Sequence, residues 1–136
     1  MRWTRRAWTT LAAASGFVAV AAGAFAAHGL ADPKAAELMR TGATYEMTHA
    51  LATIGCAVLI QLGATRARLA PAFFLAGTLL FSGSLYALAL GAPRAAGLVT
   101  PLGGVSFLIG WATLAWAALG VDQPSSETTA LGRASP

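Results

Sequence analysis

Four residues in the second quarter of the chain have side chains that could take part in chemistry. Glu46, His49, Thr53 and Cys56 are spaced three, four and three residues apart. In an α-helix this spacing places them on one face. A carboxylate and an imidazole on one face could exchange a proton, bind a polar ligand or ligate a metal ion. Their surroundings are apolar, where polar groups are expensive and often functional.

Further polar residues lie in or beside three other apolar stretches of the chain. We expect them to meet the first group in one intramembrane cluster. Its predicted members are His28, Tyr45, Glu46, His49, Ser84, Tyr86 and Thr100. Three interpretations are open: a structural hydrogen-bond network, a site for a small molecule, proton or lipid headgroup, and a metal or haem site using His28 and His49. The first is favoured, because intramembrane polar groups commonly bond across helices.

Motifs of known catalytic or metal-binding chemistry are missing from the sequence. The histidine spacing matches no dedicated metal motif, and there is no nucleophile–base pair, phosphate-binding loop or pair of carboxylates. The single cysteine, Cys56, cannot form an intrachain disulfide and is interpreted as a small packing residue. The sequence therefore predicts a protein that is not an enzyme and needs no metal or cofactor.

Four long apolar blocks must position the polar residues. They cover residues 7–27, 47–65, 69–93 and 95–121, and none contains Asp, Glu, Lys or Arg. A helix needs about 20 apolar residues to cross a bilayer. Only 10% of the chain is charged, against about 25% in soluble domains. Residues 1–121 are thus predicted to form an all-α, polytopic four-helix bundle in the membrane, and residues 122–136 a disordered, polar cytoplasmic tail.

Two Pro-containing pairs mark predicted helix starts. Asp32 is a good N-cap, and Pro33 suits the first helical position. The segment after this pair is predicted to be a short interfacial helix between spans one and two, which continues or bends at Gly42. Thr100 and Pro101 form a similar pair, so the fourth span should begin there and residues 95–99 should be loop.

Glycines at helical spacing mark the expected contacts between helices. In lipid, helices approach closely where small residues line the contact. The residues expected to do so are Gly16, Gly23, Gly83, Gly103 and Gly110. The alternative is that the row of small residues on one of these helices forms a contact between two copies of the chain. The expected partners are membrane lipids, with a second copy or another membrane protein as a further candidate.

The basic residues lie beside the apolar blocks rather than in one patch, which argues against nucleic-acid binding. With the N-terminus inside, the cytoplasmic side holds Arg2, Arg5, Arg6, Arg66 and Arg68, and the other side holds Lys34, Arg40 and Arg94. This bias predicts that both termini are cytoplasmic. The first block is longer than the 7–15-residue apolar region of a signal peptide, so we expect it to be retained.

Four sequence motifs resemble one known family. They are GAFAAHGL (Gly23–Leu30), YEMTHALA (Tyr45–Ala52), LFSGSLYALAL (Leu80–Leu90) and TPLGGVSFLIGW (Thr100–Trp111). In this order they resemble the small bacterial inner-membrane family known as domain of unknown function 423, to which animal transmembrane protein 256 is similar. The resemblance covers about Gly16 to Leu119, and Ala26 stands where the family often has Gly. It implies a four-helix membrane protein of no established biochemical activity.

The sequence thus favours a structural, accessory or assembly factor of the bacterial inner membrane that acts through helix packing. One alternative is a small transporter or a ligand- or lipid-binding protein with a polar site near the external leaflet. A second is a haem- or quinone-associated accessory subunit.

Overall fold

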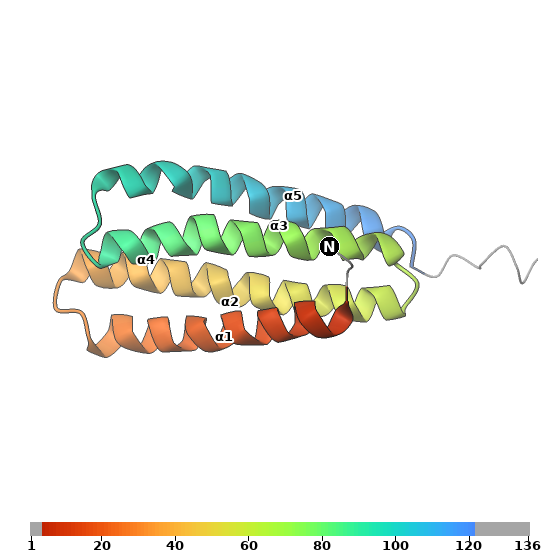
Figure 1. Ribbon diagram of the computed structural model, residues 1–136, viewed down its shortest axis with the longest axis horizontal. Coiled ribbons are helices and arrows are strands. Elements are labelled where there is room, and N and C mark those ends of the chain that lie inside the picture. Colours follow the sequence, from red (N-terminus) through yellow and green to blue (C-terminus); the bar gives the residue numbers. More distant parts are fainter. Residues whose placement is uncertain (1–3, 122–136) are drawn as a thin grey trace, which may run out of the picture.

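The computed structural model describes residues 4–121 of the chain. In this part, four helical segments are long and apolar enough to cross a membrane: Arg5–His28, Pro33–Gln61, Thr65–Ala89 and Arg94–Ala118. They lie side by side and antiparallel (Figure 1), and residues 4–121 contain no strand. The all-α, four-span fold predicted from the apolar blocks is therefore confirmed. The tail predicted for residues 122–136 lies outside the described residues.

The first two spans are single helices, α1 (Arg5–His28) and α2 (Pro33–Gln61). The third span combines four segments: the 3-10 turn η1 (Thr65–Leu69), α3 (Ala70–Gly77), the π-helical turn η2 (Thr78–Ser82) and α4 (Gly83–Ala89). The fourth consists of the 3-10 turn η3 (Arg94–Val99) and α5 (Thr100–Ala118). The turns before η1 and η3 contain Gly63 and Gly91, whose positive φ angles of 95° and 92° favour glycine.

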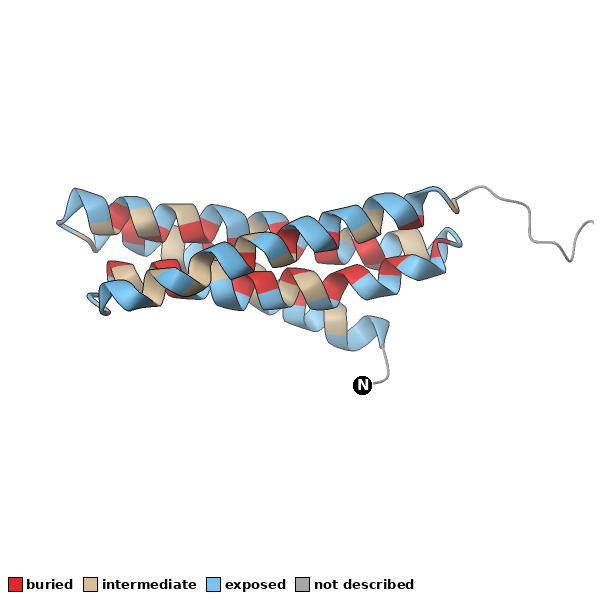
Figure 2. Cartoon of the chain, turned by 90° about the horizontal axis from the view of Figure 1, so that it is seen from above, coloured by how far each residue is buried: buried red, intermediate tan, exposed pale blue. Residues whose placement is uncertain are grey.

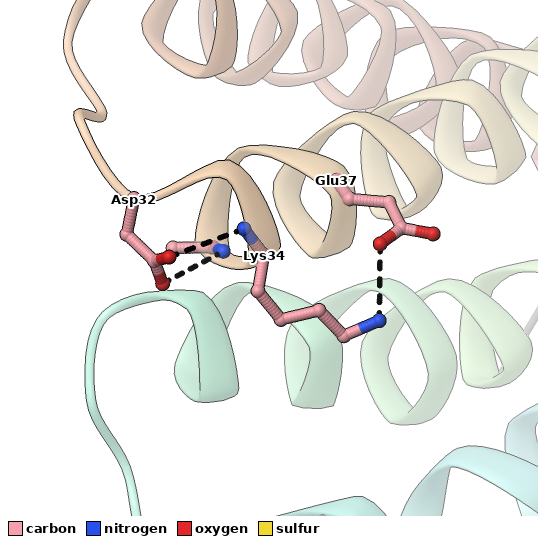
Figure 3. A network of polar contacts seen from close by, with 4 residues as sticks. Asp32, Lys34 and Glu37 are labelled. Atoms are coloured by element: carbon pink, nitrogen blue, oxygen red, sulfur yellow. Dashed lines mark hydrogen bonds and ion pairs between the residues drawn. The ribbon is translucent and has the colours of Figure 1, made fainter.

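The start of α2 agrees with the expectation from the sequence. The carboxylate of Asp32 accepts hydrogen bonds from the backbone N–H groups of Lys34 and Ala35, at 3.3 and 3.1 Å (Figure 3). From there α2 runs for 29 residues without interruption. The segment expected to be a short interfacial helix forms the first turns of α2, and the chain does not bend into a new helix at Gly42.

The four spans form an open row rather than a closed ring. α2 and the third span occupy the middle, α1 packs against α2, and α5 packs mainly against the third span (Figure 1). Buried residues gather on the faces that meet (Figure 2). Outward faces carry exposed large apolar side chains such as Phe17, Leu79 and Leu108. In lipid these faces need no further cover, since their chemistry matches that of acyl chains.

The contact between α1 and α2 depends on small side chains. The buried residues of α1 are Ala12, Ala19 and Ala26, each seven positions after the last. Gly16 and Gly23 lie on the same side, and a Cβ atom there would be 3.9 Å from the Met47 sulfur and 4.0 Å from the Ala43 Cβ. Both glycines therefore face α2 across ordinary van der Waals distances.

The contact between the third and fourth spans is closer. A Cβ atom on Gly103 would collide with the backbone of Phe81, and one on Gly110 would lie 2.5 Å from the ring of Phe74. Gly77, which was not among the glycines predicted to lie at contacts, packs equally closely against the ring of Phe107. These three glycines let α5 approach the third span.

Gly83 does not have the packing role that its spacing predicted. It is exposed, and a Cβ atom there would meet nothing within 4 Å. Ala76, seven residues earlier, is also exposed, so both small residues lie on the outward face of the third span. Gly77, on the other side of this span, makes the close contact instead.

The fourth span begins differently from the predicted cap. The α-helix starts at Thr100 as expected, but residues 95–99 are part of the helical turn η3 rather than a loop. The Thr100 hydroxyl caps no backbone group at this helix start. It lies 2.6 Å from the Ser84 hydroxyl and joins α5 to α4.

Candidate functional site

Glu46 is the most buried acidic side chain of the described residues, with 5% of its surface exposed. It projects from α2 between two neighbouring helices. Ser15 of α1 donates a hydrogen bond of 2.8 Å to Oε1, and Tyr86 of α4 donates one of 2.6 Å to Oε2. In residues 4–121 the one ion pair is Lys34–Glu37, so no cation balances Glu46. The carboxyl group is held by hydroxyl groups from both sides, as burial of a polar group requires.

Tyr86 reaches Glu46 because Gly42 lies one turn earlier on α2. A Cβ atom on Gly42 would be 2.7 Å from Cε1 of Tyr86, so only glycine leaves room for the ring. One turn before Tyr86, the fully buried Ser82 donates a 2.9 Å hydrogen bond to the Gly42 carbonyl. Gly42 and Glu46 of α2 thus contact Ser82 and Tyr86 of the third span.

His49 lies one turn beyond Glu46, and both of its ring nitrogens are engaged. Nδ1 is 2.6 Å from the backbone carbonyl of Tyr45, and the indole N–H of Trp111 in α5 donates to Nε2 at 3.1 Å. A carbonyl can only accept and an indole N–H can only donate. These partners require the neutral imidazole with its proton on Nδ1. His49 therefore holds no free lone pair for a metal ion or a proton in this arrangement.

The imidazole is also stacked within a group of aromatic rings. Its centroid lies 3.4 Å from that of Phe107, with the planes 6° apart. Phe74 contacts both His49 and Trp111, each at 5.4 Å between centroids. Tyr45 continues the group toward Phe81 at 4.5 Å. The rings fix the position of His49 and join α2 to the third and fourth spans.

Space around these side chains is distributed unevenly. Beside Ser15, His49 and Thr53, the enclosed space is about 10 Å³, room for no more than one water molecule. Between α2 and α5 an open groove of about 700 Å³ reaches His49 from the outer surface. The groove is lined by Thr44, Tyr45, Thr48, His49, Phe81, Pro101, Gly104, Val105, Phe107, Leu108 and Trp111. We call it the α2–α5 groove.

The structure brings together some of the predicted cluster and separates the rest. Glu46 and Tyr86 are bonded directly, and Tyr45 and His49 lie on the same part of α2. Ser84 and Thr100 form a bond of their own between α4 and α5.

His28 does not join the predicted cluster, and the expected proximity of the two histidines is wrong. It is exposed in the last turn of α1 and lies 13 residues after Ser15, about 20 Å along the helix. The second span begins at Pro33 rather than near Met47, which moves Glu46 and His49 to the interior of α2. Across residues 4–121, no group of three or more His, Cys, Asp or Glu side chains is placed to hold a metal ion.

Two partners of the buried polar residues, Ser15 and Trp111, were not predicted from the sequence. Ser15 is a polar residue in the middle of the first apolar block. Trp111 lies in the interior of the fourth block, although Trp favours the membrane interface. A polar or amphipathic residue far from a span end was the available signal in both cases.

Four apolar helices whose buried polar groups bond to one another define a small integral membrane protein. A family model described as "Protein of unknown function (DUF423)" matches residues 22–104. The chain belongs to this family, which confirms the resemblance drawn from its four motifs.

Curated relatives support the assignment. The chain is 47% identical over 112 residues to a UPF0382 membrane protein of Haemophilus influenzae, covering 80% of this chain and 90% of the relative. It is 48% identical over 115 residues to the UPF0382 inner membrane protein YgdD of Escherichia coli, covering 82% and 88%. A UPF0382 membrane protein of Staphylococcus epidermidis is 38% identical over 112 residues, covering 80% and 92%. No solved structure matches the chain significantly.

Proposed function

We propose that the protein is a non-catalytic component of the bacterial inner membrane, which acts as a structural, accessory or assembly factor through the packing of its helices. The observation that carries this proposal is the pairing of the buried polar side chains. Glu46, Ser82 and His49 each bond to a different helix. Groups whose hydrogen bonds are satisfied inside the protein hold helices together and leave nothing to bind a substrate.

The small enclosed space beside the polar residues supports the same proposal. A transported solute or a substrate would need a cavity of several hundred Å³ next to the groups that recognise it. The space beside Ser15, which donates to Glu46, is about 10 Å³, and the α2–α5 groove reaches His49 without reaching Glu46. The region around Glu46 is therefore closed. The proposed alternative, a small transporter or ligand-binding protein centred on Glu46 and His49, would need this region to open.

We also propose that all four spans cross the membrane and that both termini are cytoplasmic. The antiparallel helices group Arg5, Arg6, Arg66 and Arg68 at one end of the bundle, together with the end of α5 (Figure 1). The other end has Lys34, Arg40 and Arg94. The end that carries more basic residues is expected to be cytoplasmic.

The test compares protein abundance with complementation of a deletion strain in competitive growth. If the network is structural, Glu46→Ala and His49→Ala should lower abundance and complementation together. Leu79→Ala, on the outward surface of the third span, is the control and should change neither. Loss of complementation by the Glu46 or His49 variant at normal abundance and normal melting temperature would contradict the proposal and favour the transporter or ligand-binding alternative.

A further inference from the structure

We propose that the α2–α5 groove is a specific site for an anionic phospholipid, with one acyl chain in the groove and the phosphate at Arg40. This site is distinct from the Glu46 network, because neither Glu46 nor its hydroxyl donors line the groove. The proposal does not rest on the proposed function, since a structural factor and a transporter could both bind such a lipid.

The inner part of the groove has the chemistry of an acyl-chain site. Its walls are aromatic and aliphatic, and α5 contributes Val105, Leu108 and Trp111. These side chains are 53%, 69% and 44% exposed, so the groove opens toward the surrounding lipid. A volume of about 700 Å³ falls within the range of small-molecule sites, 300–1,000 Å³.

Gly104 leaves part of this space empty. It lines the groove on α5, and a Cβ atom there would meet nothing within 4 Å. Gly103 and Gly110 on the same helix differ from it, because the third span packs against them. Gly104 therefore contributes room to the groove without taking part in helix packing.

The outer part of the groove continues to a positive charge. A shallow depression of about 270 Å³ is lined by Glu37, Arg40, Thr41, Thr44 and Tyr45. It shares Thr44 and Tyr45 with the groove, so the two spaces adjoin. Arg40 therefore lines a surface depression that adjoins the apolar groove at Thr44 and Tyr45.

Arg40 has no anionic partner within residues 4–121. The nearby carboxylate of Glu37 is paired with Lys34 at 3.0 Å, and that is the one ion pair in this part of the chain (Figure 3). An arginine without a carboxylate partner favours a bidentate anion such as a phosphate group. The local charge is therefore complementary to an anionic headgroup.

The distances along α2 match the shape of a phospholipid. Arg40 precedes His49 by nine residues, which is about 14 Å along a helix. Met39, beside Arg40, packs against Ala26 and Ala89 in the last turns of α1 and α4. Arg40 is thus near the end of the bundle, at headgroup level, while the groove extends inward to Trp111. A phosphate at Arg40 would direct an attached acyl chain along the groove.

The experiment uses Trp111 as a reporter within the groove. Trp3, Trp8 and Trp116 are replaced by Phe in the full chain, which leaves Trp111 as the one indole. The protein is reconstituted into vesicles of phosphatidylglycerol and phosphatidylcholine, with brominated acyl chains on one lipid at a time. Bromine quenches indole fluorescence at short range, so the quenching measures the occupancy of the groove by each lipid.

We expect phosphatidylglycerol to occupy the groove with about fivefold preference, the size of effect that one arginine near an anionic lipid provides. Arg40→Gln should remove the preference. Arg94→Gln, which removes an exposed arginine outside the groove lining, is the matched control and should keep it. Free inorganic phosphate should not compete, because it lacks the acyl chain.

Substitutions that fill the groove test whether an acyl chain lies in it. Gly104→Leu should reduce quenching of Trp111 by both brominated lipids, and Val105→Phe provides a second filler should the first variant fold poorly. Gly83→Leu, at an exposed position outside the groove, is the control. Equal quenching by the two lipids in the parent protein would overturn the headgroup assignment. Competition by free phosphate would overturn the proposal that the ligand is a lipid, because it would show that a phosphate group binds without an acyl chain. Unchanged quenching in both filled variants would overturn the placement of the acyl chain in the groove. Disulfide crosslinking of the Thr48→Cys variant to a second copy would also overturn the proposal, because it would show that another protein chain covers the groove.

Discussion

The phenolic oxygen of Tyr86 lies 2.6 Å from Oε2 of Glu46, across 40 residues of sequence. It is the bond by which α4 supplies a donor to the buried carboxyl group of α2. Ser15 supplies the other donor from α1, so Glu46 joins three helices. Removing either donor should therefore weaken the contact of α2 with a neighbouring helix.

Replacing Tyr86 with Phe should destabilise the protein by about 1–3 kcal/mol, because a buried acceptor loses its donor while the ring remains. The free energy of unfolding can be measured by denaturant titration in detergent micelles. Tyr45→Phe is the control, since no hydrogen bond from the Tyr45 hydroxyl to residues 4–121 is present. Equal stability of the two variants would show that the Tyr86–Glu46 bond contributes nothing.

Gly42→Ala should lower stability by about 1–3 kcal/mol through overpacking, because the added Cβ atom would displace the Tyr86 ring. The matched control is Gly55→Ala, also in α2, where a Cβ atom meets nothing within 4 Å. That change should be neutral or stabilise by up to about 1 kcal/mol through helix propensity. Thermal unfolding of both variants in the same detergent makes the comparison, and a destabilised Gly55 variant with an unaffected Gly42 variant would reverse our assignment.

Gly110→Leu should destabilise the contact of α5 with α3, because its side chain would meet the Phe74 ring. The expected loss is again about 1–3 kcal/mol, measured as a lower melting temperature in detergent. Leu114→Ile conserves side-chain volume and should be milder. Similar effects of the two changes would mean that Gly110 faces lipid instead of the third span.

His49 should be observed as the neutral tautomer with its proton on Nδ1, because Trp111 donates to Nε2. Nitrogen chemical shifts of histidine-labelled protein in detergent distinguish the two ring nitrogens directly. In Trp111→Phe the donor is lost, and the spectrum should show a mixture of tautomers or a changed Nε2 shift. A proton on Nε2 in the parent protein is incompatible with the hydrogen bonds described for this ring.

Reporter fusions test the proposed orientation. A reporter that is active only outside the cytoplasm should be silent when fused after Val121 and active when fused after Asp32. The physical basis is the excess of arginine at the end of the bundle that contains Arg5 and Arg66. The reverse pattern of signals would require the opposite orientation in the membrane.

The sequence predicted the parts of the fold that depend on composition and local chemistry. Uncharged blocks located the four spans, and Asp32–Pro33 located the start of α2. The sequence did not show which face of the third span packs against its neighbours. Helical spacing shows which residues share a face of a helix but not which face meets a neighbour, so Gly83 faces outward although its spacing indicated a contact.

The candidate site shows a similar division. The hydrogen bond of Glu46 with Tyr86 joins two members of the predicted cluster, because both are polar residues in apolar blocks. The depth of these residues was misjudged, since α2 begins at Pro33 and Glu46 is therefore well inside the helix. Gly42 and Trp111 have their roles only through contacts with other helices, which local sequence patterns do not contain.

The edge position of α1 also has a consequence for the order of assembly during synthesis. α1 packs against α2, and both helices are complete about 25 residues before Tyr86 is added to the chain. Ser15 is therefore the first hydroxyl donor available to Glu46 when the α1–α2 hairpin enters the bilayer. We expect Ser15→Ala to reduce insertion of a chain shortened after η1, whereas Tyr86 can act only on a hairpin already in the membrane. The same carboxyl group would then serve two stages of biogenesis in succession, first the pairing of the early hairpin and later the docking of the third span.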